Sequence, residues 1–106
     1  MKNLDGRLVV ITGGARGIGR ATAERLTRAG CRVVIGDLDA ALARSVAETI
    51  GSGAVAAELD VTSAESWRAF LAAVADAGPI DVLVNNAGVM PIGSLLKESD
   101  DVTRTI

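Results

Sequence analysis

Residues 8–19 read Leu8-Val9-Val10-Ile11-Thr12-Gly13-Gly14-Ala15-Arg16-Gly17-Ile18-Gly19, and this stretch decides the fold of the chain. Its apolar, β-branched first half is typical of a buried strand, and an alanine-rich amphipathic segment follows its glycines. The stretch therefore predicts a strand that turns sharply into a helix. N–H groups and the positive dipole end at the start of such a helix attract phosphate, so this loop is a candidate phosphate-binding site.

Three glycines of the loop have separate predicted roles. Gly13 lets the chain turn, Gly17 lets the backbone approach a ligand without a Cβ, and Gly19 lets the helix pack closely on the sheet. Their spacing is Gly-x-x-x-Gly-x-Gly, which differs from the Gly-x-Gly-x-x-Gly of the commonest dinucleotide fingerprint. Because ordinary turns are also rich in glycine, the interpretation depends on the strand before the loop and the helix after it.

The composition limits the class of protein. The chain has 106 residues, enough for one modest domain, and 49% of them are hydrophobic. Trp67 and Phe70 are its only aromatic residues, so alanine and branched aliphatic side chains must fill the core. The net charge is −2 and no basic run occurs, which gives nucleic-acid binding no electrostatic support. Histidine is absent, which argues against zinc sites and histidine-based triads.

The sequence also bears on the cellular compartment. No apolar stretch reaches the length of a membrane span, and no signal-peptide pattern follows Met1. The single cysteine, Cys31, cannot form a disulfide within the chain, and its place at the start of an apolar run predicts a small buried side chain in a reducing compartment. We therefore expect a cytoplasmic protein that does not bind membranes.

Strand and helix patterns alternate along the chain. Four apolar runs predict strands, at Leu8–Ile11, Arg32–Ile35, Ala54–Leu59 and Ile80–Val84. Helical periodicity between them predicts apolar faces made of Ile18, Thr22, Leu26 and Ala29, then Leu42, Val46 and Ile50, then Trp67, Phe70, Leu71 and Val74. Thr62 and Glu65 form a capping-box pattern at the start of the third helix.

This order of elements predicts an α/β fold, a doubly wound parallel sheet of Rossmann type with helices on both faces. In a strand order of 3-2-1-4 the fourth strand would be an exposed edge, although its sequence is apolar. Ser99, Asp100 and Asp101 could start a last helix. Only about two turns fit between Ser99 and the last residue, Ile106, and a helix that short is marginal in water. Residues 1–106 are therefore interpreted as a dinucleotide-binding domain that is the N-terminal part of a longer single-domain protein.

Polar residues follow the other three strands, at the sheet edge where such folds bind ligands. Asp37 could accept both hydroxyls of an adenosine ribose and would repel a 2′-phosphate, or else Asp37 or Asp39 caps a helix. Asp60 could accept an adenine amino hydrogen while the Val61 N–H meets a ring nitrogen, or Asp60 could also be a cap. The run Asn85-Asn86-Ala87-Gly88 could bridge strand ends and admit a sugar, or be a plain turn.

Taken together, the glycine loop from Thr12, Asp37, Asp60-Val61 and Asn85-Asn86-Ala87-Gly88 resemble the short-chain dehydrogenase/reductase family, in its ordinary non-extended branch. The resemblance covers essentially the whole chain. It implies that the pyrophosphate is surrounded by Gly13, Arg16, Gly17, Ile18 and Gly19, that Asp37 holds the ribose, that Asp60 and Val61 contact the adenine, and that Asn86, Ala87 and Gly88 line the path to nicotinamide. Asp37 favours NAD. Arg16 favours NADP, but a carboxylate facing a 2′-phosphate outweighs it.

The same resemblance implies an oxidoreductase that acts on a small alcohol or ketone and forms a homo-oligomer. Family members act through a serine, a Tyr-x-x-x-Lys pair and a supporting asparagine further along the chain, whereas these 106 residues contain no tyrosine. Ser94 and Lys97 are interpreted as surface residues. The chain is thus expected to supply the cofactor-binding half and to be inactive alone.

Three other functions share parts of this sequence pattern. A non-catalytic dinucleotide sensor or interaction module would need the same loop. An S-adenosylmethionine-dependent methyltransferase could use acidic residues after the second and third strands, but Thr12 stands where an acidic residue is expected. The glycine spacing and the Asn-Asn-Ala-Gly run also disfavour it. A phosphate-loop NTPase is disfavoured because no Gly-Lys-Ser/Thr follows the glycines.

Overall fold

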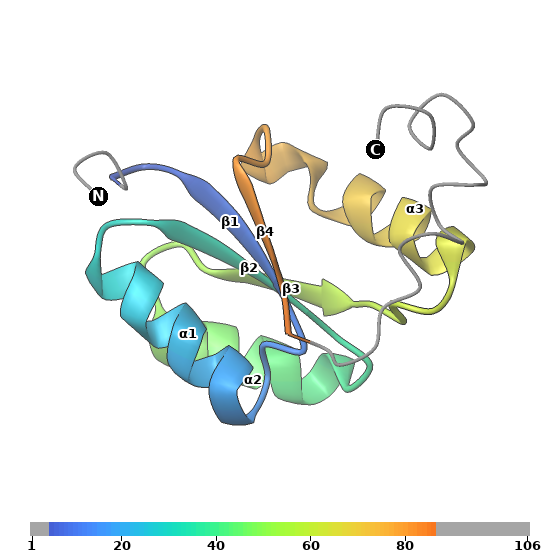
Figure 1. Cartoon of the computed structure of the whole chain (residues 1–106), viewed down its shortest axis with the longest axis horizontal. Helices are drawn as coiled ribbons and strands as arrows, with labels where there is room; N and C mark the ends of the chain where they lie inside the picture. Colours follow the sequence, from blue (N-terminus) through green and yellow to red (C-terminus); the bar gives the residue numbers. More distant parts are fainter. Residues whose placement is uncertain (1–4, 87–106) are drawn as a thin grey trace.

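A parallel sheet with helices on both faces makes up the computed structural model, which describes residues 5–86 (Figure 1). Its elements are β1 (Leu8–Thr12), α1 (Gly17–Arg28), β2 (Arg32–Asp37), α2 (Ala40–Ile50), β3 (Val55–Glu58), α3 (Ala64–Ala73), the 3₁₀ helix Ala75–Ala77 and β4 (Val82–Asn85). The strand order is β3-β2-β1-β4 and every pair is parallel. The predicted Rossmann-type fold and strand order are therefore confirmed.

The sheet divides the core into two layers. Successive side chains of a strand point to opposite faces, so Val9 and Ile11 of β1 face α1 and α2, whereas Leu8 and Val10 face α3. Figure 1 shows α1 and α2 together on one side of the sheet and α3 on the other. Because both faces of β1 and β2 are covered, their sequences are continuous apolar runs. Cys31 is buried in the layer under α1 and α2, as predicted.

The predicted apolar face of the first helix is confirmed in part. Leu26 packs against the core layer on this side of the sheet, and Thr22 is half-buried. Ile18 is 77% exposed and Ala29 is also exposed, whereas the buried residues of α1 are Gly19 and Ala23. These two small residues let the helix axis approach the neighbouring backbone, and that approach sets the rotation of the helix. Ile18 is one residue before Gly19, so its side chain leaves the helix in a different direction.

Two details of the third helix also differ from prediction. Trp67 and Phe70 are buried, with ring centroids 6.1 Å apart in an edge-to-face arrangement, but Leu71 at the margin of this stripe is 42% exposed. The N-cap is Ser63, whose hydroxyl oxygen accepts from the Ser66 N–H at 3.0 Å, so the capping box predicted from Thr62 is wrong. The Thr62 hydroxyl instead donates to Asp60 in the preceding turn.

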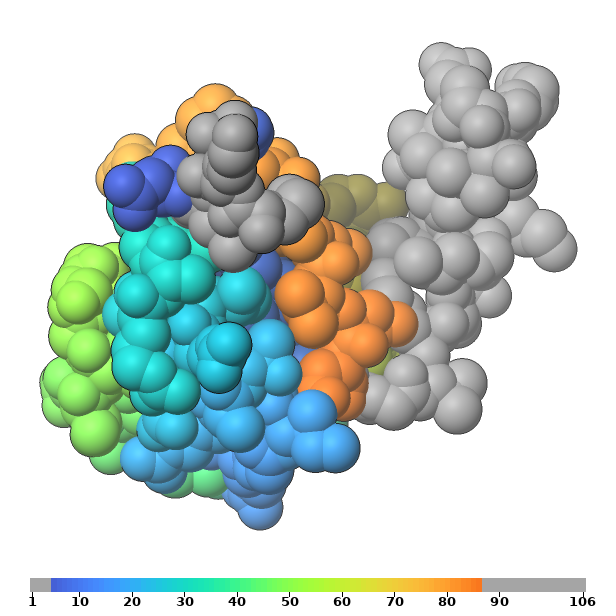
Figure 2. All heavy atoms as spheres, turned by 60° about the vertical axis from the view of Figure 1, so that its left-hand side comes forward, coloured from blue at the N-terminus to red at the C-terminus, as the bar shows by residue number. Residues whose placement is uncertain are grey.

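Among the described strands, β4 lies at one edge of the sheet, as its place in the order predicts. Val82 and Leu83 are 42% and 44% exposed, and Figure 2 shows the orange atoms of this segment at the surface. The helix predicted from Ser99 lies outside the described residues. None of the helices within residues 5–86 has the length and apolar character that a membrane crossing requires.

We expect Phe70→Ala to lower the free energy of unfolding by about 3–5 kcal/mol, because it removes a fully buried ring. Leu71→Ala, next to it and partly exposed, should cost less than about 1 kcal/mol. Urea denaturation of both variants measures the difference. Equal losses would contradict the packing of α3 described above.

Candidate functional site

A cavity of about 310 Å³ opens where the carboxyl ends of β1, β2 and β3 meet. It is lined by Gly13, Arg16, Asp37, Leu38, Leu59, Asp60, Val61 and Thr62. The structure therefore brings the residues predicted at three successive strand ends to one rim. Ligands of open α/β sheets bind beyond the carboxyl ends of the strands in this way, and the volume is in the range of small-molecule sites.

The glycine loop leads from β1 into the open end of α1. Gly13 has a φ of +67°, where the chain leaves the strand, and its N–H donates to the Gly36 carbonyl at 2.7 Å, which holds the start of the loop to β2. Gly17 has a φ of +59°, and a Cβ built there would meet no atom within 4 Å. No side chain caps α1, and no acidic residue occupies its first turn, whereas α2 and α3 have side-chain caps. The start of α1 thus keeps the N–H groups that an anion requires.

Gly19 is required for close packing at the loop. A Cβ on this residue would lie 2.2 Å from the Gly13 carbonyl oxygen and 2.5 Å from Nδ2 of Asn86. The predicted close approach is therefore present. Its partners are the loop and the residue after β4, and no atom of a strand interior is among the nearest.

Asp37 holds the loop after β1 to the loop after β2. Its Oδ2 accepts from the Ala15 N–H at 3.2 Å and its Oδ1 accepts from the Asp39 N–H at 3.0 Å. The cap of α2 is Asp39, whose Oδ1 accepts from the Leu42 N–H at 3.0 Å, so Asp37 is not that cap. An ionised carboxylate offers about four acceptor positions, so Asp37 keeps capacity for ligand hydroxyls while its orientation is fixed.

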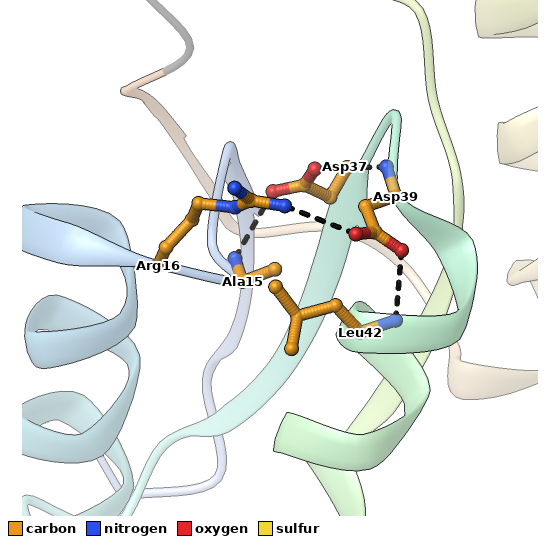
Figure 3. Close-up of polar contacts among 5 residues, drawn as sticks. All are labelled: Ala15, Arg16, Asp37, Asp39 and Leu42. Carbon is orange, nitrogen blue, oxygen red and sulfur yellow. Dashed lines mark hydrogen bonds and ion pairs between the residues drawn. The ribbon is translucent and has the colours of Figure 1, made fainter.

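Arg16 reaches across the rim to Asp39. Its Nη2 lies 3.0 Å from Oδ2 of Asp39, and the two side chains are 68% and 44% exposed. Figure 3 shows the guanidinium directed at the carboxylate of Asp39. The sequence placed Arg16 in the loop but gave no sign of this pairing, which joins residues 23 positions apart.

Asp60 organises the turn before α3. The hydroxyl and the N–H of Thr62 both donate to Oδ1 of Asp60, at 2.6 Å and 2.9 Å. The hydrogen bond from the Thr62 hydroxyl, and to a lesser extent that from the Thr62 N–H, lowers the pKa of Asp60 below its ordinary value and so favours the ionised form. Because Ser63 caps α3, Asp60 is not its cap. The carbonyl of Val61 accepts from Nε1 of Trp67 at 3.1 Å.

The end of β4 is fastened to the end of β1, as predicted for the asparagines. The side chain of Asn86 donates to the Gly13 carbonyl at 3.3 Å. Thr12, which is fully buried, accepts from the Asn86 N–H at 2.9 Å and donates to Oδ1 of Asn85 at 3.0 Å. This role of Thr12 was not predicted from the sequence, although a hydroxyl directly after a buried apolar run is a signal for it. The predicted residues Ala87 and Gly88 lie outside the described part.

Comparison with known proteins agrees with this geometry. The family model described as short chain dehydrogenase matches residues 7–106. The chain belongs to the short-chain dehydrogenase family. This membership excludes the methyltransferase and phosphate-loop NTPase alternatives. Within residues 5–86, no group of three or more acidic, cysteine or histidine side chains could hold a metal ion.

Several dehydrogenases are similar to the chain. A sorbitol dehydrogenase of Cereibacter sphaeroides is 47% identical, over 92% of this chain and 40% of the relative. An L-rhamnose 1-dehydrogenase (NAD(P)(+)) of Azotobacter vinelandii is 45% identical, over 85% of this chain and 38% of the relative. A solved structure of a short-chain dehydrogenase/reductase of Burkholderia phymatum in complex with NAD superposes with a TM-score of 0.72 at 30% identity. The match covers 78% of this chain and 31% of that protein. The chain spans about two fifths of the length of the curated relatives it matches.

We expect Gly19→Ala to destabilise the fold although alanine is the better helix former. Helix propensity alone would stabilise the variant by about 1 kcal/mol. The new Cβ would collide with the Gly13 carbonyl, and overpacking of this kind costs about 1–3 kcal/mol. Urea denaturation gives the sign, and a variant more stable than the parent would contradict the close packing at the loop.

Proposed function

We propose that the protein is an NAD(H)-dependent oxidoreductase that transfers a hydride between the cofactor and a small alcohol or carbonyl substrate. In this proposal residues 1–106 are its dinucleotide-binding domain, the N-terminal part of the fold. The observation that carries it is Asp37, whose carboxylate is oriented by two backbone donors on the cavity rim, next to the glycine loop. Membership of the family supports the reaction class.

The cofactor would extend along the rim from the end of β3 to the end of β4. Asp60 and Val61 would contact the adenine, and Asp37 would accept the hydroxyls of its ribose. The first turn of α1, with Gly17 and its positive φ, would receive the pyrophosphate. Residues assigned to the pyrophosphate are Gly13, Arg16, Gly17, Ile18 and Gly19, and those assigned to the path toward nicotinamide are Asn86, Ala87 and Gly88.

Ile18 supports this placement through its exposure. Ile18 is 77% exposed and does not contribute to the hydrophobic core, because the buried residues of α1 are Gly19 and Ala23. A bound dinucleotide would cover this apolar side chain. The nicotinamide, when bound, would supply or accept the hydride, while the residues described here bind and orient it.

The preference for NAD rests on charge. A 2′-phosphate placed at the ribose hydroxyls would face the carboxylate of Asp37, and juxtaposed like charges cost several kcal/mol. The guanidinium of Arg16 forms its ion pair with Asp39, which compensates part of the charge that could offset this repulsion. The NAD complex of the Burkholderia phymatum relative supports the same cofactor. The homo-oligomeric state, the substrate and a cytoplasmic location stay predictions from the sequence and the resemblance.

We expect Asp37→Ala to weaken NADH binding by roughly tenfold or more, since a hydrogen bond to a charged group is lost. The variant should also discriminate less against NADPH, because the carboxylate that repels the 2′-phosphate is gone. Titration calorimetry with both cofactors measures this. Asp37→Asn keeps the shape of the side chain and separates loss of charge from disruption of the loop. An unchanged preference in both variants would contradict the ribose role.

The 106-residue chain should bind NADH yet show no turnover with any alcohol or ketone, because it contains no tyrosine to act as the acid or base that the resemblance implies. Absorbance of the reduced nicotinamide follows turnover. A non-catalytic dinucleotide sensor would also lack turnover when the full protein is assayed, so activity of the full protein separates the two functions. Turnover by the 106 residues alone would contradict the assignment.

A further inference from the structure

The side chain of Asp39 makes two contacts with different oxygen atoms. Oδ1 accepts from the Leu42 N–H at 3.0 Å and caps α2, while Oδ2 lies 3.0 Å from Nη2 of Arg16 (Figure 3). A cap needs only the first contact. The second draws a cation of the glycine loop toward the start of α2, across the rim of the cavity.

We propose that Asp39 is a specificity-determining residue that acts by holding Arg16. This inference rests on the proposed function, because it concerns which dinucleotide the same cavity accepts. A guanidinium is a strong, bidentate partner for phosphate, so an unengaged Arg16 would attract the 2′-phosphate of NADP and offset the repulsion from Asp37. Asp39 competes for this guanidinium and so strengthens the preference for NAD.

The charges around the cavity support this role. Among residues 5–86, Arg16 is the only cationic side chain that lines the cavity, and Asp37 and Asp60 line it with carboxylates. With Arg16 paired to Asp39, a 2′-phosphate meets the negative side chain of Asp37 and a cation whose charge is already compensated. Because both partners are substantially exposed, the pair is weak, and a phosphate could displace it at a modest cost. The effect should therefore be a graded bias.

The test is Asp39→Asn, because asparagine caps a helix as well as aspartate does but has no charge to hold Arg16. Calorimetry with NAD⁺ and NADP⁺ at low ionic strength gives the ratio of the two dissociation constants. We expect this ratio to shift about two- to fivefold toward NADP⁺, in line with the strength of exposed pairs. The unfolding temperature should stay unchanged, since the cap of α2 is kept.

A second substitution tells whether Asp39 acts through Arg16 or repels the phosphate directly. Arg16→Gln should cost more NADP⁺ affinity in the Asp39→Asn background than in the parent, because only there is the guanidinium available to the phosphate. Additive effects of the two substitutions would overturn the proposal.

Glu24→Gln is the matched control. It removes the same charge and breaks a similar exposed pair, Arg20–Glu24 at 3.2 Å, whose residues do not line the cavity. The cofactor ratio should not change in this variant. A shift as large as that of Asp39→Asn would overturn the proposal, because net charge alone would then explain the effect.

The outcomes for the parent chain separate this inference from the proposed function. If NAD⁺ does not bind to the parent, the proposed function fails and the role of Asp39 fails with it. If NAD⁺ binds and Asp39→Asn leaves the ratio unchanged, the role of Asp39 alone is overturned.

Discussion

The rest of the structure depends on the fastening of the β1 loop to both neighbouring strands. Toward β2, the Gly13 N–H bonds to the Gly36 carbonyl and the Ala15 N–H bonds to Asp37. Toward β4, the buried hydroxyl of Thr12 donates to Asn85 at the end of the strand and accepts from the N–H of Asn86 after it. Each of these bonds uses a polar group that would otherwise be unsatisfied near the core. They fix the positions of the strand ends and hence of every side chain on the rim.

The same backbone hydrogen bonds explain how the carboxylates of Asp37 and Asp39 can lie near Arg16 at the rim although no buried ion pair joins them. Asp37 and Asp39 are oriented by backbone N–H groups, which stabilise carboxylates without a cation. Arg16 is left at the surface, where its contribution to stability is small and its position is open to competition. Along the described rim, the carboxylates are thus oriented by backbone donors, whereas Arg16 is oriented by an exposed pair with one side chain.

Much of this arrangement could be predicted from the sequence. Continuous apolar runs predict buried parallel strands, and spaced glycines between a strand and a helix predict the loop. The rotation of α1 could not be predicted, because apolar spacing does not reveal that Gly19 must touch the Gly13 carbonyl. The cap of α3 shifts by one residue because Thr62 bonds to Asp60. The contact of Arg16 with Asp39 depends on the tertiary fold, and no local pattern encodes it.

The contact between Trp67 and Val61 gives the chain an internal optical probe. Trp67 is the only tryptophan of the chain. Its indole N–H donates to the carbonyl of Val61, and Val61 lines the cavity. Indole emission responds to the polarity and hydrogen bonding around the ring. Fluorescence of the unmodified protein therefore responds both to the packing of α3 and to changes at the end of the cavity that Val61 lines, and no label is needed.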